Sequence, residues 1–396
     1  MANIPGEFLL FALTLLCVAL FHRHTLLVAV VGLAEIICFK LAFGSFHGVA
    51  GLPGLATHLA HEWVILANLG CLLLGFALLA RHFEKSHIPL VLPHVLPDDW
   101  KGAFLLLVIV FVLSSFLDNI AAAMIGGAMA HSLFKKVHIG YLAALVAASN
   151  AGGAGSVIGD TTTTMMWIAG IAPVDVLHAY VASGTALLVC GLPAAFQQHA
   201  YSPIRKDVKH KPRIDWVRVG IVVTMLVAAI GANVIVNLRF PAAADHFPFI
   251  GAAVWTVIVL SARIRRPDWE LLGEAGRGAV FLLALVVAAS MMPVEALPAA
   301  SWRTALGMGF VSAVFDNIPL TKQALDQGGY DWGMLAYCVG FGGSMIWFGS
   351  SAGVAISNLY PEARSVGAWL RHGWHVPVAY VVGFVLMLLL LGWHPS

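Results

Sequence analysis

Long apolar runs, separated by short polar connections, make up most of the chain. A helix that crosses a bilayer needs about 20 mostly apolar residues, and about ten runs meet or approach that length. They are residues 6–21, 25–43, 62–80, 139–172, 175–196, 217–236, 248–262, 278–293, 333–358 and 375–393. This pattern predicts an all-α polytopic membrane protein with about ten transmembrane spans.

Two further apolar runs, residues 103–134 and 302–327, are each interrupted midway by an Asp-Asn pair. The pair is Asp118-Asn119 in the first run and Asp316-Asn317 in the second. A carboxylate in the middle of a lipid-facing helix is costly, so neither run fits a simple crossing. We expect each run to fold as a re-entrant hairpin with its Asp-Asn pair near the tip.

Basic residues predict the orientation of these elements, because Lys and Arg collect in the cytoplasmic loops of membrane proteins. They are concentrated in the connections 81–101, 205–218 and 263–277 and at Lys135–Lys136. With these connections inside, the hairpin at 103–134 starts and ends inside, and the hairpin at 302–327 starts and ends outside. Both termini are then expected outside.

Composition narrows the class of protein further. Only 11% of the 396 residues are Asp, Glu, Lys or Arg, and 60% are hydrophobic. A soluble domain typically has about 25% charged residues, so the composition excludes a soluble globular enzyme, a disordered chain and a nucleic-acid binder. The few charges inside apolar runs need an explanation. Lys322, in the second hairpin, is expected to be buried or to snorkel to the interface.

The two halves of the chain carry similar motifs in the same order. The Asp-Asn pairs are 198 positions apart, and the pairs Gly152-Gly153 and Gly342-Gly343 are 190 apart. Each half then holds five spans and one hairpin, and because five is odd the second half enters the membrane the opposite way. We expect an inverted-topology repeat. Its parts are a first repeat at 1–200, a cytoplasmic basic linker at 201–216 and a second repeat at 217–396.

The repeated segments are too polar for lipid-facing helix. Residues 150–164 contain four glycines, one carboxylate and four consecutive threonines. Irregular backbone at membrane depth is tolerated only inside protein or beside water, so we expect two broken helices whose ends face an ion. Hard cations prefer oxygen ligands. The candidates are Asp160, Thr161 and Thr162 in the first half and Ser350 and Ser351 in the second.

Asp118 and Asp316, at the hairpin tips, are expected to approach these broken helices near the midplane of the membrane. An ionisable side chain at that depth is costly and is normally functional. A carboxylate there can hold either a proton or a metal cation, which is what exchange requires. The alternative is that each Asp only caps a helix start, for which Asp is well suited. That alternative weighs most for Asp316, because the nearby Pro319 marks a turn or a helix start.

These motifs resemble those of NhaD-type sodium/proton antiporters, part of a broad ion transporter superfamily that includes arsenite permeases and dicarboxylate carriers. In the first half the resemblance rests on Ala148–Gly153 and Gly159–Trp167. In the second half it rests on Phe315–Pro319, Gly342–Ser344 and Gly349–Ala355. One departure stands out, since the family usually has hydroxyl residues after the first Asp-Asn pair, where this chain has Ala121-Ala122-Ala123.

The resemblance implies proton-coupled export of Na⁺ or Li⁺ by a homodimer in the bacterial inner membrane. It implies a transporter that is not an enzyme, with small inorganic ions and the lipid bilayer as partners and no nucleic acid. No cofactor is expected beyond the transported Na⁺ and H⁺. The implied ion site contains Asp118, Asn119, Asn150, Asp160, Thr161, Thr162, Asp316, Asn317, Ser344, Ser350 and Ser351, with Na⁺ at Asp118 and Asp160.

Two other functions compete with a cation/proton antiporter that works by alternating access. An anion or oxyanion carrier could use the same fold, because helix N-termini bind anions, although the carboxylates would repel an anion unless they were protonated or paired with a cation. An intramembrane aspartyl protease also pairs two membrane Asp residues. Its G-x-G-D motif is not met here, since residue 157 is Val where that motif has its first Gly.

Overall fold

All the regular elements that the structure describes are helical. It is a computed structural model that describes residues 5–21, 24–46, 48–91, 96–204, 213–240, 243, 246–315 and 317–396, so half of the expected basic linker, residues 205–212, lies outside the description. Among the described residues, β pairing is limited to two isolated bridges, Phe46–Val49 and Phe134–Ile204. The all-α class is therefore confirmed.

The helices fall into three consecutive stretches of chain. The first holds α1 (Gly6–Leu20), α2 (Thr25–Phe43), α3 (Gly51–Glu84), α4 (Ile88–Val91), α5 (Trp100–Ser114) and α6 (Asn119–Leu133). The second holds α7 (Ile139–Ala154), α8 (Thr161–Ile168), α9 (Pro173–Leu177), α10 (Ala179–Tyr201), α11 (Trp216–Arg239) and α13 (Phe249–Ser261). The third holds α14 (Leu271–Ser290), η2 (Val294–Ala296), α15 (Trp302–Ser312), α16 (Asn317–Gln327), α17 (Trp332–Gly342), α18 (Ser351–Leu359), η3 (Pro361–Arg364), α19 (Val366–His372) and α20 (His375–Leu391).

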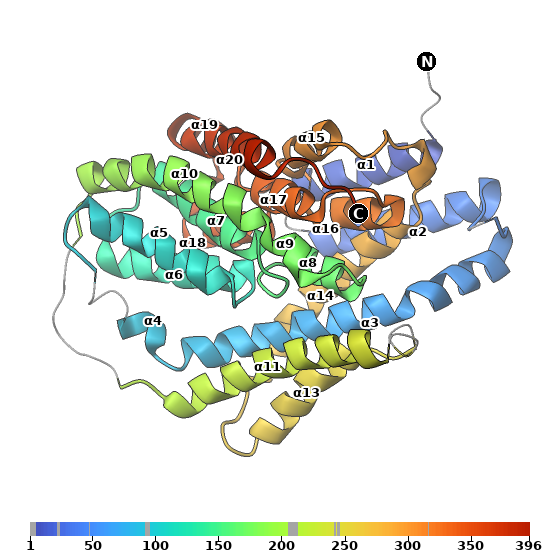
Figure 1. Cartoon of the computed structure of the whole chain (residues 1–396), viewed down its shortest axis with the longest axis horizontal. Helices are drawn as coiled ribbons and strands as arrows, with labels where there is room; N and C mark the ends of the chain where they lie inside the picture. The colour runs from blue at the N-terminus through green and yellow to red at the C-terminus, as the bar shows by residue number, and fades with distance from the viewer. Residues whose placement is uncertain are drawn as a thin grey trace.

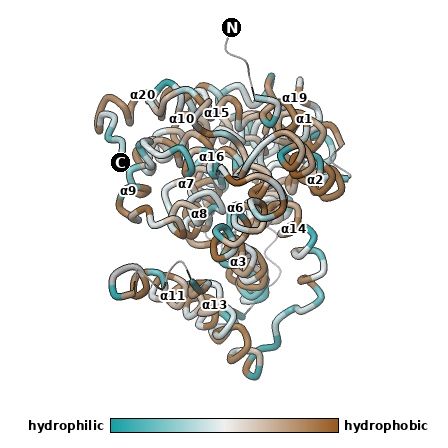
Figure 2. Tube along the Cα trace, turned by 90° about the vertical axis from the view of Figure 1, so that its right-hand side faces the viewer, coloured by the Kyte–Doolittle hydropathy of each residue, from teal (hydrophilic) through white to brown (hydrophobic). Residues whose placement is uncertain are grey.

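The long helix α3 separates two groups of helices (Figures 1 and 2). On one side, α11 and α13 pack on each other and on α3. On the other side lies a larger group that contains both hairpins, α5–α6 and α15–α16, and the helices around them. The helix α14 contacts α3, α2 and α16, so it links the N-terminal helices to the second hairpin.

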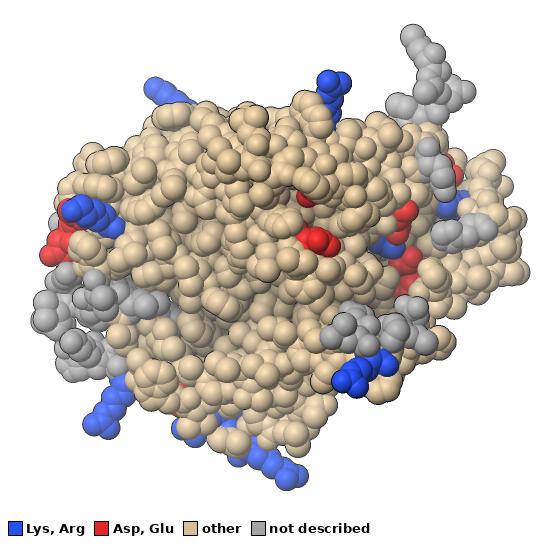
Figure 3. Space-filling view, in the orientation of Figure 1, with Lys and Arg blue, Asp and Glu red and all other residues tan. Residues whose placement is uncertain are grey.

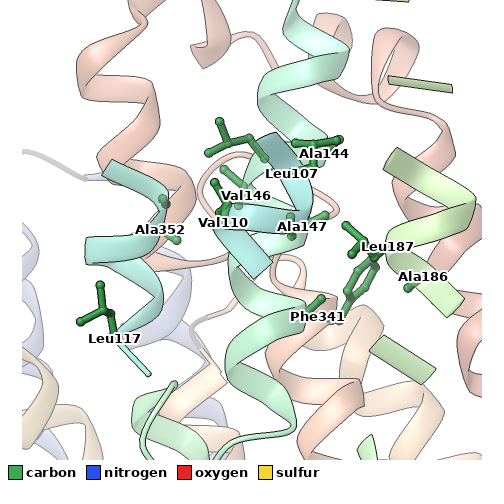
Figure 4. Packing of buried hydrophobic residues seen from close by; sticks show 14 of the residues in the cluster. Leu107, Val110, Leu117, Ala144, Val146, Ala147, Ala186, Leu187, Phe341 and Ala352 are labelled. Atoms are coloured by element: carbon green, nitrogen blue, oxygen red, sulfur yellow. The ribbon is translucent and has the colours of Figure 1, made fainter. Parts of the chain in front are cut away.

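Helices α7 and α17 lie at the centre of the larger group and pack against each other. All residues of α17, and all of α7 from Gly140 onward, are buried. A helix that is apolar on every side is expected to be surrounded by protein in this way. Small residues of α7, such as Ala144 and Ala147, allow neighbouring Leu107, Val110 and Phe341 to approach closely (Figure 4).

Both predicted hairpins are pairs of helices that break just before the Asn of the Asp-Asn motif. In the first, α5 ends at Ser114 and α6 begins at Asn119; in the second, α15 ends at Ser312 and α16 begins at Asn317. The two glycine-rich runs break as their glycines predict, between α7 and α8 and between α17 and α18. The partners are exchanged, because α6 packs on α18 and α8 packs on α16.

Close backbone contacts require glycine at matching positions of the two halves. A Cβ atom on Gly152 of α7 would lie 2.0 Å from the carbonyl oxygen of Phe111 in α5. A Cβ atom on Gly342 of α17 would lie 2.3 Å from the carbonyl oxygen of Gly309 in α15. Any larger residue would therefore separate the broken helix from the adjacent hairpin in either half.

Among the described residues, five helices are long and apolar enough to cross a membrane, or six if the bent pair α19–α20 is one span. The chain is therefore a helical integral membrane protein. Several other predicted spans correspond to apolar helices of 10–17 residues. The number ten stays a prediction. The face in Figure 3 is mostly uncharged, with Lys and Arg mainly near its periphery, as expected for a surface in contact with lipid.

A cluster of charges ties the end of α3 to the connection before α14. Asp268 accepts hydrogen bonds from Lys85 at 2.8 Å and from Arg81 at 2.9 Å. The bond from Lys85 and then the bond from Arg81 lower the pKa of Asp268 from 3.8 to about 2. Because the pKa is lower in the folded protein, the stabilisation is complete above the unfolded pKa and is lost as the pH falls through about 2.

We therefore expect Asp268→Asn to lower the apparent melting temperature slightly at pH 7, since exposed ion pairs contribute little. The difference from the parent protein should shrink as the pH falls from 4 toward 2, which thermal unfolding of the detergent-purified protein measures. Glu84→Gln is the control, because it removes a pair with Arg81 that lies within α3. A difference that grows toward pH 2 would contradict this account.

Candidate ion-binding site

Asp160 lies deep inside the protein, at the break between α7 and α8, with 2% of its surface exposed. It is the N-cap of α8, and its Oδ1 accepts a hydrogen bond from the Thr162 N–H at 3.2 Å. Its Oδ2 accepts a hydrogen bond from Asn317 Nδ2 at 3.4 Å. The break thus brings a buried carboxylate of the first half to the Asn at the start of α16 in the second hairpin.

A network of buried amides and hydroxyls lies across the two halves. Asn119 Nδ2 donates to Asn150 Oδ1 at 3.1 Å. Asn150 Nδ2 in turn donates to Ser344 Oγ at 2.9 Å and to Ser350 Oγ at 3.1 Å. Four of the predicted site residues therefore meet, and Asn150 joins the first hairpin to the break between α17 and α18.

A cavity of about 260 Å³ has both Asp118 and Asp160 in its wall. Asp118 is the N-cap of α6, where its Oδ2 accepts from the Ile120 N–H at 3.1 Å. Thr161 and Thr164 of α8 complete the polar part of the lining. The rest of the wall is mainly apolar and comes largely from α3 and α14, including Leu69, Leu72, Phe76, Ala279 and Leu282. The two carboxylates expected to hold Na⁺ thus face a single cavity.

The predicted site residues do not all line this cavity. Ser350 and Ser351 line a second cavity of about 170 Å³, beside Phe315 and Phe348. Thr162 is fully buried, and its hydroxyl has no hydrogen-bond partner among the described residues. Asp316 lies outside the described residues. Two cavities thus lie at the two helix starts, one with Asp160 before α8 and the other with Ser350 before α18.

Both interpretations of the aspartates are compatible with this geometry. Asp118 and Asp160 are N-caps, as the simpler interpretation predicts. A carboxylate can accept about four hydrogen bonds, so capping does not use up its capacity. Thr161 and Thr164 line the same cavity, so its wall includes four side chains that carry oxygen, the ligand type that suits a hard cation.

Lys322 is buried, which is one of the two positions that the sequence predicts for it, and it pairs with a carboxylate of α3 that the sequence does not predict. Its Nζ lies 3.0 Å from Glu62 Oε1 and 2.6 Å from Asp326 Oδ1. The predicted third span begins at residue 62, at the membrane surface, whereas α3 begins at Gly51. The spacing of Leu52, Leu55 and Leu59 was the available signal that the helix starts earlier.

The fold and the site define a class, an integral membrane protein with carboxylates around a buried cavity, which is typical of ion transporters. Within that class, the chain is similar to named antiporters. Sodium/proton antiporter 1 of Arabidopsis thaliana is 28% identical over 296 residues, which are 63% of this chain and 49% of the relative. Sodium/proton antiporter 2 of Arabidopsis thaliana is 28% identical over 293 residues, 63% of this chain and 67% of the relative.

A bacterial relative matches to a similar extent. The Na(+)/H(+) antiporter NhaD of Halomonas elongata is 26% identical over 295 residues, which are 62% of this chain and 58% of the relative. No family model matches the chain. The matched part spans about half the length of the first of these relatives. The similarity confirms the resemblance to sodium/proton antiporters that the motifs predict.

Proposed function

We propose that the protein is a secondary active transporter that exchanges Na⁺ or Li⁺ for H⁺. The observation that carries the proposal is the single cavity lined by Asp118, Asp160, Thr161 and Thr164. Each of the two carboxylates in the cavity wall can hold either a cation or a proton. Binding of Na⁺ and binding of a proton then exclude each other, which is the basis of exchange. The negative charge of these carboxylates disfavours an anion as the substrate.

The proposed cycle is alternating access, in which the site moves between the two faces only when it holds an ion or a proton. Asp118 and Asp160 would bind the Na⁺ or the proton. Asn317 would orient Asp160 through its hydrogen bond. Asn119, Asn150, Ser344 and Ser350 would hold the two halves in register through their network, and Thr161 would add a hydroxyl ligand. We also propose a homodimer that needs no cofactor.

The two halves are proposed to form an inverted-topology repeat. Matching hydrogen bonds support it, since Ser114 Oγ donates to the Ser149 carbonyl and Ser312 Oγ donates to the Val339 carbonyl. These donors are 198 positions apart and their acceptors 190, the same offsets as the Asp-Asn and Gly-Gly motifs. The exchanged packing of α6 on α18 and of α8 on α16 is a second support.

The basic connections support an orientation with the Arg81 end of α3 in the cytoplasm. Arg81, Lys85 and the residues around Asp268 lie together at that end. The cavity lining extends toward it, as far as Ala80 in α3 and Leu271, the first residue of α14. The structure would then represent a conformation whose site is nearer to the cytoplasmic face.

The direct test is exchange in proteoliposomes made from the purified protein. With a proton gradient imposed, we expect added Na⁺ or Li⁺ to drive proton movement in the opposite direction, followed with a pH-sensitive dye and ²²Na⁺. K⁺ is the comparison ion, and empty liposomes are the control. Proton movement that does not depend on Na⁺ or Li⁺, together with uptake of a dicarboxylate or arsenite, would replace this proposal with an anion carrier.

A further inference from the structure

A buried ion pair joins α3 to the second hairpin away from the cavity. Lys322 Nζ of α16 lies 3.0 Å from Glu62 Oε1 of α3, and the side chains are 5% and 7% exposed. Lys322 also contacts Asp326, four residues along its own helix, at 2.6 Å. Asp326 is more accessible, with 26% of its side chain exposed. Only the pair with Glu62 therefore connects two separate helices.

Stability does not account for this pair. Removing two charges from water commonly costs as much as their attraction returns, so well-packed apolar residues would serve the fold as well. Lys322 already has a carboxylate partner within α16. The other oxygen of Glu62, Oε2, is buried without a hydrogen-bond partner among the described residues. Intramembrane charges kept at such cost are functional by default.

An apolar layer lies between this pair and the cavity. Leu69 of α3, Met165 of α8, Val286 of α14 and Ile318 of α16 pack together in one buried cluster with Leu282. Leu69 and Leu282 also line the cavity, so the layer forms its end. Along α3, Glu62 precedes Leu69 by seven residues, or about 10 Å of helix, on the side away from Arg81.

The order along α3 is therefore ion pair, apolar layer and cavity. The cavity lining continues from Leu69 to Ala80, toward the Arg81 end. At the opposite end, a second contact ties α3 to α14, between His58 Nε2 and Ser290 Oγ at 2.9 Å. The helices that would have to separate to reach Asp160 from the Gly51 end of α3 are thus held together at the level of Glu62.

We propose that Glu62 and Lys322 are the positioning residues of a closed gate, which together with the apolar layer bars the cavity from the face at the Gly51 end of α3. The inference rests on the proposed function, since a gate has meaning only for a transporter. Lys322 follows Asn317, the partner of Asp160, by five residues on the same helix, about 7.5 Å along its axis. Release of Lys322 from Glu62 would free α16 to move away from α3 and expose Asp160 to that face.

The test measures access to the cavity and does not depend on ion transport. A reporter cysteine is introduced by Ala121→Cys, at a position in the cavity wall. The background lacks Cys17, Cys38 and Cys71, the free cysteines that are not fully buried. A membrane-impermeant maleimide is added to oriented proteoliposomes from one face or the other. With the native pair, labelling is expected to be much faster from the face at the Arg81 end.

Glu62→Gln should then raise labelling from the face at the Gly51 end by about tenfold, because removing the pair shifts the population toward the open gate. Asp326→Asn is the matched control, since it neutralises the other carboxylate of Lys322, which lies on the same helix as Lys322. Lys322→Arg, which keeps the charge, should label like the parent. Equal labelling in Glu62→Gln and Asp326→Asn, or equally fast labelling of the parent from both faces, would overturn the gate.

The double variant E62Q/K322M provides the same test if Glu62→Gln does not reach the membrane. It removes both charges of the buried pair together. An unpaired buried charge, which is the usual cause of misfolding after one partner is removed, is therefore avoided. It must also open the cavity to the Gly51 face, and unchanged labelling in this variant would refute the gate. Failure of Na⁺ exchange with a normal labelling pattern would instead count against the proposed function and leave the gate intact.

Discussion

Replacing Asp160 with Asn is expected to abolish Na⁺-dependent proton exchange while the protein still folds. Loss of one member of a buried charge pair costs about 2–5 kcal/mol, so the affinity for Na⁺ should fall by at least about 30-fold. The fold should survive because Asn is as good an N-cap as Asp and can still accept from the Thr162 N–H. Calorimetric binding of Na⁺ and Li⁺, together with flux in proteoliposomes, measures both consequences.

Asp331→Asn is the matched control for this variant. Asp331 is also a buried aspartate, 6% exposed, and caps α17 by accepting from the Met334 N–H at 3.0 Å. It is not among the residues that line the cavity of Asp118 and Asp160. A general penalty for neutralising a capping aspartate would reduce exchange equally in both variants. Full exchange in Asp160→Asn would remove Asp160 from the ion site and leave Asp118 as the carrier.

Much of the candidate site could be predicted because its chemistry is local in sequence. The glycines around Asn150 and Gly342 mark the helix breaks, and an Asp or Ser that follows such a break is placed as an N-cap by short-range hydrogen bonding. Asp160 and Ser350 both occupy this position, each capping the helix that follows its break. The same local rules put Asp118 at the start of α6.

What the sequence could not predict depends on contacts between distant segments. The pairing of Lys322 with Glu62 joins residues 260 positions apart, and no periodicity encodes it. The separation of Ser350 and Ser351 into their own cavity also depends on packing, in this case against Leu15, Phe281 and neighbouring side chains. The length of the third span could not be predicted for a related reason. The helix α3 extends well beyond the predicted residues 62–80, and it packs against α2 and α14, which are distant in sequence or in a separate element.

The proposed repeat predicts that glycines at matching positions of the two halves contribute similarly to stability. Gly152→Ala and Gly342→Ala are both expected to destabilise the protein, because the new methyl group would meet a hairpin carbonyl at 2.0 Å or 2.3 Å. Overpacking of this kind typically costs about 1–3 kcal/mol, and a rigid backbone neighbour favours the upper end of that range. Both variants should lower the apparent melting temperature of the detergent-purified protein by several degrees.

Gly184→Ala in α10 is the control, because no atom lies within 4 Å of its Cβ position. In a helix interior that exchange should be neutral or stabilise by up to about 1 kcal/mol. If the halves are equivalent, Gly152→Ala and Gly342→Ala should produce similar losses, since each separates a broken helix from its hairpin. A loss confined to one of the two would mean that the matching glycines do not play matching roles, which would count against the repeat.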